Sequence, residues 1–80
     1  MFINKAENGK NNLCGKNVAI VRTQMGISQR ALADKLQIAG LDIDKNAVQR
    51  IEAGKRFVTD IELKILSIVL NISLEELLLE

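Results

Sequence analysis

Helix start and stop signals follow one another at short intervals along this chain, and they constrain its fold more than any other feature. Residues 59–62 (TDIE) and 73–76 (SLEE) each match the capping box that opens a helix. Isolated glycines at positions 26, 40 and 54 stand where left-handed helix C-termini are expected. Because these start and stop signals recur so often within 80 residues, only short helices fit between them. The sequence therefore predicts an all-α fold with five helices.

The apolar spacing between these signals locates the helices. Apolar residues at 13, 14, 18, 21 and 25 fall on one helical face. Ser28 and Asp44 each precede a run of good helix formers and are expected to be N-caps. No alternating β-type segment and no internal repeat interrupts this pattern. The expected helices span about 13–25, 29–39, 45–53 and 60–70, with a short last helix after Ser73.

The chain divides into a short arm and one domain. Residues 1–12 are polar and rich in Asn, so we expect a flexible N-terminal arm, followed by a single domain over 13–80. A core of this size supplies only about 3–5 kcal/mol of stability. No apolar run approaches the roughly 20 residues that cross a bilayer, so we expect no membrane segment.

The composition disfavours catalysis. The chain has no His, no Tyr and one Cys, so no His/Cys metal cluster is expected, and its glycines form no phosphate-binding loop. Cys14 lies on the apolar side of the first helix, where a small core residue is a better interpretation than a redox centre. We predict that the protein is not an enzyme and uses no metal or cofactor. A single cysteine favours a reducing compartment.

Charge is distributed unevenly along the chain. Residues 1–58 carry ten Lys and Arg against five acids, whereas residues 59–80 carry one Lys against five acids. This asymmetry is what a protein that touches a polyanion with one face would show.

The helix expected over 45–53 carries side chains of the types that read DNA bases. Arg and Lys donate to guanine, Asn and Gln pair with adenine, and each good contact discriminates by about 1–3 kcal/mol. At about 100° per residue these side chains share one flank, while the apolar residues point back toward the other helices. On any single helix taken by itself, a solvated polar face is the better explanation of such a pattern. The four residues are Lys45, Asn46, Gln49 and Arg50.

Three segments in order resemble a known family. Residues 28–33 (SQRALA), 48–56 (VQRIEAGKR) and 70–78 (LNISLEELL) look like the Cro/repressor-type, or Xre family, helix-turn-helix domain. The resemblance covers about residues 13–78. It implies a compact five-helix lambda-repressor-like domain in which the second and third helices form the helix-turn-helix. Family members usually bind near-palindromic double-stranded DNA as dimers, which implies a bacterial or phage-encoded cytoplasmic protein.

The resemblance also implies roles for individual residues. Base contacts fall on Lys45, Asn46 and Arg50, with Gln49 as a further candidate. Phosphate contacts fall on Gln29, at the start of the second helix, and on Lys55 and Arg56, after the third. An ion pair characteristic of the family falls on Arg22 and Glu52, where it would orient the third helix.

One departure from the family concerns the connection between the second and third helices. It is five residues longer than usual, around the sequence QIAGLDI. We expect the second helix to extend to Ala39, Gly40 to end it, and Leu41 and Ile43 to tuck under the third helix. The angle of the third helix in a DNA groove is not fixed by the sequence.

The last two helices carry more apolar residues than one small core needs. A homodimer interface through these helices and crowded packing in the monomer both explain this surplus. Our leading interpretation is a sequence-specific DNA-binding regulator of transcription that acts as a repressor. One alternative is the antitoxin of a toxin–antitoxin pair, which would also hold a protein partner. Another is a protein-interaction module that has kept the fold and lost DNA binding.

Overall fold

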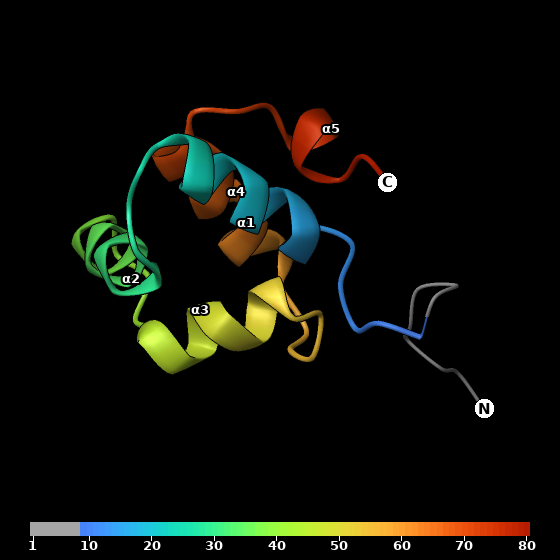
Figure 1. Ribbon diagram of the computed structural model, residues 1–80, viewed down its shortest axis with the longest axis horizontal. Helices are drawn as coiled ribbons and strands as arrows, with labels where there is room; N and C mark the ends of the chain where they lie inside the picture. The colour runs from blue at the N-terminus through green and yellow to red at the C-terminus, as the bar shows by residue number, and fades with distance from the viewer. Residues whose placement is uncertain (1–8) are drawn as a thin grey trace.

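Five helices follow one another through residues 9–80, the part of the chain that this computed structural model describes (Figure 1). Every regular element in that part is a helix, which confirms the prediction of an all-α fold. Residues 1–8 of the expected N-terminal arm lie outside the described residues. The helices are α1 (Gly15–Gln24), α2 (Gln29–Ile38), α3 (Lys45–Glu52), α4 (Asp60–Leu70) and α5 (Leu74–Leu77).

The predicted N-caps of α2 and α3 are present. The Ser28 hydroxyl accepts a hydrogen bond from the Ala31 amide at 3.0 Å, and the Asp44 carboxylate accepts one from the Ala47 amide at 2.9 Å. Each cap satisfies a backbone N–H that has no partner within its own helix. These two helices therefore begin at the residues that the sequence indicates.

The two predicted capping boxes differ. At α4 the Thr59 hydroxyl accepts from the Glu62 amide at 3.2 Å, and the Glu62 carboxylate accepts from the Thr59 amide at 2.9 Å, which completes the box. At α5 the Ser73 hydroxyl accepts from the Glu76 amide at 3.0 Å, but the return contact is different. The Glu76 carboxylate takes its hydrogen bond from the Ser73 hydroxyl at 3.2 Å, so the second box is only half formed.

The first helix is shorter than predicted at both ends. We expected residues 13–25, whereas α1 runs from Gly15 to Gln24. Its N-cap residue, Cys14, makes no side-chain cap. The Gly15 amide instead donates to the side-chain oxygen of Asn12 at 2.8 Å. A residue that we assigned to the flexible arm thus caps the helix.

A single hydrophobic core joins all five helices. In Figure 1, α1 lies in front of α4, α3 runs along the lower edge, and α5 lies at the opposite edge. The α2 helix packs on α3 and α4, and α1 packs on α3, α4 and α5. The buried apolar residues are Cys14, Val18, Leu32, Ala33, Leu36, Ile43, Val48, Ile51, Leu66, Leu70 and Leu77.

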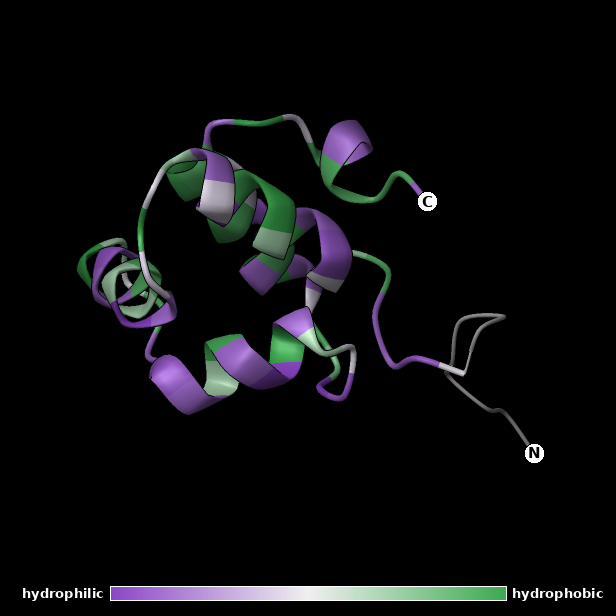
Figure 2. Ribbon diagram, in the orientation of Figure 1, coloured by the Kyte–Doolittle hydropathy of each residue, from purple (hydrophilic) through white to green (hydrophobic). Residues whose placement is uncertain are grey.

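The helices differ in polarity according to their place around this core. Figure 2 shows α4 hydrophobic along much of its length, whereas α3 is mostly hydrophilic and turns only a few apolar residues inward. No helix within residues 9–80 has the length and apolar character needed to cross a bilayer.

The long connection between α2 and α3 is ordered and packed. Gly40 has φ of +100°, and the Leu41 amide donates to the Leu36 carbonyl at 2.9 Å, a pattern that ends a helix with a left-handed residue. Ile43 is 5% exposed and Leu41 is half-buried, which confirms that these residues pack into the domain. The Gln37 side chain donates to the Ile43 carbonyl at 2.9 Å and holds the connection against α2.

Candidate nucleic-acid interface

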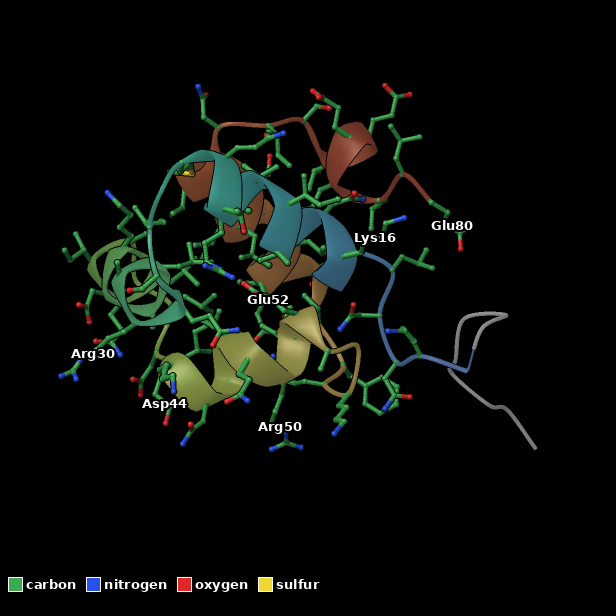
Figure 3. The ribbon with its side chains drawn as sticks, in the orientation of Figure 1. Lys16, Arg30, Asp44, Arg50, Glu52 and Glu80 are labelled. Carbon is green, nitrogen blue, oxygen red and sulfur yellow. The ribbon has the colours of Figure 1, made fainter. Side chains whose placement is uncertain are left out.

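The α3 helix turns a row of polar side chains away from the domain. Val48 and Ile51 are each 1% exposed, so α3 is anchored by its inner side. Figure 3 shows the Arg50 guanidinium pointing away from the body of the molecule. Within the described residues, no other protein group pairs with the four outer side chains. We call Lys45, Asn46, Gln49 and Arg50, all exposed, the outward face of α3.

A shallow hollow of about 270 Å³ joins this outward face to the loop that follows α3. Its lining includes two cationic side chains, Arg50 and Lys55, and no acidic one. The hollow therefore favours an anionic or hydrogen-bonding ligand. Its lining residues are Asn46, Gln49, Arg50, Ala53 and Lys55.

Gly54 brings Lys55 beside Arg50. Its φ of +76° is a left-handed conformation, which lets the chain reverse at the end of α3. The Gly54 amide donates to the Ile51 carbonyl at 3.0 Å, and the Lys55 amide donates to the Arg50 carbonyl at 2.9 Å. These bonds form the Schellman end of α3 and fix where the loop starts.

The ion pair implied by the family resemblance is present on the opposite side of α3. The Arg22 guanidinium donates to both carboxylate oxygens of Glu52, at 2.7 and 3.1 Å, and to the Ile27 carbonyl at 2.8 Å. This hydrogen bonding raises the pKa of Arg22 above its ordinary value. Figure 3 shows Glu52 directed toward the interior, opposite to Arg50. The pair ties α3 to α1.

Gln29 joins the same carboxylate. Its side-chain amide donates to the Glu52 carboxylate at 3.0 Å. Through Gln29 and Arg22, Glu52 therefore connects the start of α2 and the end of α1 to α3. The family resemblance implies a phosphate contact for Gln29, and this internal contact was not predicted. A primary amide has two hydrogens, so the bond to Glu52 leaves the second one for another acceptor.

Arg56 makes an internal ion pair that was not predicted, and its phosphate contact stays a prediction. Its guanidinium donates to both carboxylate oxygens of Glu62, at 3.0 and 2.9 Å, and to the Phe57 carbonyl at 3.1 Å. Glu62 is 8% exposed, and the hydrogen bond from Arg56 lowers its pKa below the ordinary value. Arg56 therefore holds the loop to the start of α4 and supplies the charged partner that a buried carboxylate requires.

The structure also shows functional-site neighbours that the sequence did not indicate. Asn11 and Asn12, expected to belong to a flexible arm, are half-buried and donate hydrogen bonds to backbone carbonyls of the loop after α3. The only sequence signal is a pair of Asn residues three and four positions before the first residue of α1, and Asn is common in flexible segments as well.

Cys14 has the environment of a core residue. Its side chain is 1% exposed, and burial raises the pKa of the thiol to about 11. A thiol with such a pKa is protonated at neutral pH and is a poor nucleophile. No cluster of three or more potential metal-ligating side chains occurs within residues 9–80.

Comparisons with known proteins identify the family. The model of the helix-turn-helix family HTH_3 matches residues 18–77. The restriction-modification controller protein C.AhdI from Aeromonas hydrophila is 33% identical in sequence, with a TM-score of 0.67 over 79% of this chain and 84% of that chain. The hypothetical transcription factor NHTF from Neisseria is 23% identical, with a TM-score of 0.74 over 92% of this chain and 79% of that chain. No curated protein sequence matches the chain.

The chain belongs to the Xre-type helix-turn-helix family, a class of DNA-binding regulators of transcription. The likeness to the Neisseria protein adds support for the fold alone. In this family α2 and α3 are the two helices of the helix-turn-helix, so the outward face of α3 becomes the candidate DNA-reading surface.

Proposed function

We propose that this protein represses transcription by binding a near-palindromic DNA operator with α3 in the major groove. The observation that carries the proposal is the outward face of α3, whose four exposed side chains have no partner in the described protein. Lys45 and Arg50 would donate to guanine, and Asn46 and Gln49 would pair with adenine. A bound domain of this kind blocks a promoter without a separate activation surface.

Phosphate contacts come from two places that flank α3. Lys55 is exposed and lies beside Arg50 at the hollow, so its ammonium reaches the same ligand surface. Gln29, in the first turn of α2, has one amide hydrogen free and lies at a helix N-terminus, where backbone N–H groups attract phosphate. Arg56 is a third candidate, because only three of the five N–H donors of its guanidinium bond Glu62 and Phe57.

Exposed apolar side chains on α4 and α5 support a homodimer. Ile61 and Ile68 of α4 are 67% and 66% exposed, and Leu79, just after α5, is 64% exposed. Two copies paired through this surface would place two α3 helices on half-sites about 34–36 Å apart, one turn of DNA. Sedimentation at tens of micromolar tests this: a monomer at that concentration contradicts the dimer.

Control of restriction-modification genes is a second, more specific candidate. It is favoured by the 33% identity to C.AhdI over most of both chains. The regulated genes would then encode a methyltransferase or an endonuclease near the gene for this protein. Binding of the purified protein to the promoter of such neighbouring genes, and not to other promoters, would support this candidate.

In-vitro selection from random duplex DNA tests the main proposal. We expect an enriched inverted repeat that binds at least about 10³-fold more tightly than a scrambled duplex at the same salt concentration. Weak, salt-dependent binding to every duplex without enrichment would contradict sequence-specific regulation. It would favour a module that has kept the fold for protein contacts.

A further inference from the structure

Three residues that precede α1 hold the backbone of the loop after α3. Four consecutive carbonyl oxygens, from residue 53 to residue 56, accept hydrogen bonds from this segment, which we call the 10–12 segment. Carbonyls at the end of a helix have no partner within it and must find one elsewhere. The bonds run from Lys10 Nζ to Ala53 (3.5 Å), from Asn11 N to Gly54 (2.8 Å), from Asn11 Nδ2 to Lys55 (3.0 Å), and from Asn12 Nδ2 to Arg56 (2.8 Å).

Asn12 is the centre of this arrangement. Its amide nitrogen donates to the carbonyls of Ile51 and Arg56, at 3.1 and 2.8 Å, while its oxygen accepts from the Gly15 amide at 2.8 Å. These partners fix the orientation of the amide, because the opposite orientation would face its oxygen toward two carbonyl oxygens. The Asn12 side chain thus links the start of α1 to the last turn of α3, at Ile51, and to the loop after α3, at Arg56.

The 10–12 segment and the start of α1 approach the end of α3 closely. A methyl group added at Gly54 would lie 2.6 Å from the Lys10 side chain, and one added at Gly15 would collide with the Ile51 carbonyl oxygen. The end of α3 is therefore in direct contact with both the 10–12 segment and α1. Lys55, whose own carbonyl accepts from Asn11, is the residue of this loop that lines the hollow beside Arg50.

We propose that Asn11 and Asn12 are positioning residues for DNA binding, which hold the Lys55 backbone where its side chain meets a phosphate. The inference rests on the proposed function, since it assigns a source of affinity to that same surface. It differs from a purely structural role because the loss of DNA affinity on substitution depends on the Lys55 side chain.

The substitution Asn12→Asp separates these two roles. An aspartate keeps the oxygen that accepts from Gly15 but loses both donations to the carbonyls of Ile51 and Arg56. The matched control is Asn17→Asp, because the Asn17 amide also donates to two carbonyls, those of Leu77 (2.9 Å) and Leu79 (2.6 Å), in the C-terminal segment. Both variants add one negative charge and remove two donors.

The first measurement is binding to a mixed-sequence DNA duplex, since phosphate contacts supply most non-specific affinity. We expect Asn12→Asp to weaken binding about tenfold, the order expected when two hydrogen bonds that order a loop are lost. Asn17→Asp should change binding less than twofold when sedimentation shows the same oligomeric state as the unaltered protein, since Asn17 holds the segment that carries Leu79. In a Lys55→Ala background the effect of Asn12→Asp should shrink to about twofold, whereas simple repulsion between the new carboxylate and DNA would persist in full.

The second measurement needs no DNA. Exchange of the Gly54 and Lys55 amides, which donate to the carbonyls of Ile51 and Arg50, should accelerate about tenfold in Asn12→Asp, with α2 amides unchanged, and should stay unchanged in Asn17→Asp. Any of three results would overturn the inference while leaving DNA binding intact. They are unchanged exchange at the loop, equal binding losses in the two variants, or an undiminished effect of Asn12→Asp in the Lys55→Ala background. Failure of the unaltered protein to bind any duplex would instead refute the proposed function, and this inference with it.

Discussion

The outward face of α3 and the loop after it are adjacent parts of one surface, yet they are built in opposite ways. The face consists of exposed side chains without protein partners in the described residues. The loop has its carbonyls bound by the 10–12 segment, and its Arg56 is bound by Glu62. Side chains that read bases must adapt to the donors and acceptors on the base edges, whereas a side chain that contacts a phosphate must be held at a fixed place. We infer that affinity rests on the ordered loop and specificity on the free face.

The largest effect is expected from the carboxylate beneath α3. Substituting Glu52 with Ala leaves the Arg22 guanidinium, whose side chain is 17% exposed, without its partner and removes the acceptor of Gln29. We expect a loss of about 3 kcal/mol in the free energy of unfolding, measured by urea denaturation. Removal of Arg22 in the same protein should restore part of that loss. A loss below about 0.5 kcal/mol would show that α3 is held by its apolar side alone.

The ion pair beneath the loop should make stability depend on pH. The hydrogen bond from Arg56 lowers the pKa of Glu62 below its ordinary value of 4.5, so this carboxylate contributes stability above that pH. The contribution is lost as the pH falls through the lowered pKa of the folded state. Glu62→Gln should cost about 2 kcal/mol at pH 7 and flatten the unfolding free energy between about pH 5 and pH 3. Substituting the exposed Glu75 in the same way should leave both unchanged.

Two glycines with similar backbones separate conformational strain from contact with the 10–12 segment. Gly26 and Gly54 have φ of +72° and +76°, but only an added methyl at Gly54 meets Lys10. Gly26→Ala should cost about 1 kcal/mol through left-handed strain alone. Gly54→Ala should cost about 1 kcal/mol more and should also weaken DNA binding. Equal losses of stability in the two variants would mean that the Lys10 side chain moves away from the added methyl at no cost.

The smallest effect on stability is expected at the outward face. Asn46→Ala and Gln49→Ala remove exposed side chains that contact no other group in the described protein. Thermal unfolding should therefore shift by no more than the equivalent of about 0.5 kcal/mol. A larger loss would mean that these side chains stabilise the fold, and it would contradict the contrast between the outward face of α3 and the ordered loop.

The sequence predicted those features that depend on short-range signals. Ser28, Asp44 and Thr59 each bond an amide three residues later, so a local pattern suffices to place the helices. The buried apolar side of α3 follows in the same way from helical periodicity. Cys14 was assigned to the core for this reason, and it is buried.

Contacts between distant residues were not predictable from local patterns. Asn12 bonds residues 39 and 44 positions away, and neither its type nor its spacing distinguishes it from an Asn in a flexible arm. The ion pair of Arg56 with Glu62 was not predicted, because it depends on how the turn between the two residues folds, and the phosphate contact of Arg56 stays a prediction. The residues on the outward face of α3 were identified from their types, and their roles in DNA recognition remain predictions.

The most direct test compares Arg50→Ala and Lys55→Ala on a selected operator and on a scrambled duplex, each over a range of salt concentrations. Arg50→Ala should cost about 1–3 kcal/mol on the operator and little on the scrambled duplex. Lys55→Ala should weaken both alike and reduce the slope of log affinity against log salt by about one. Equal losses on the two duplexes for both variants would contradict the division between a free, base-reading face and an ordered, phosphate-binding loop.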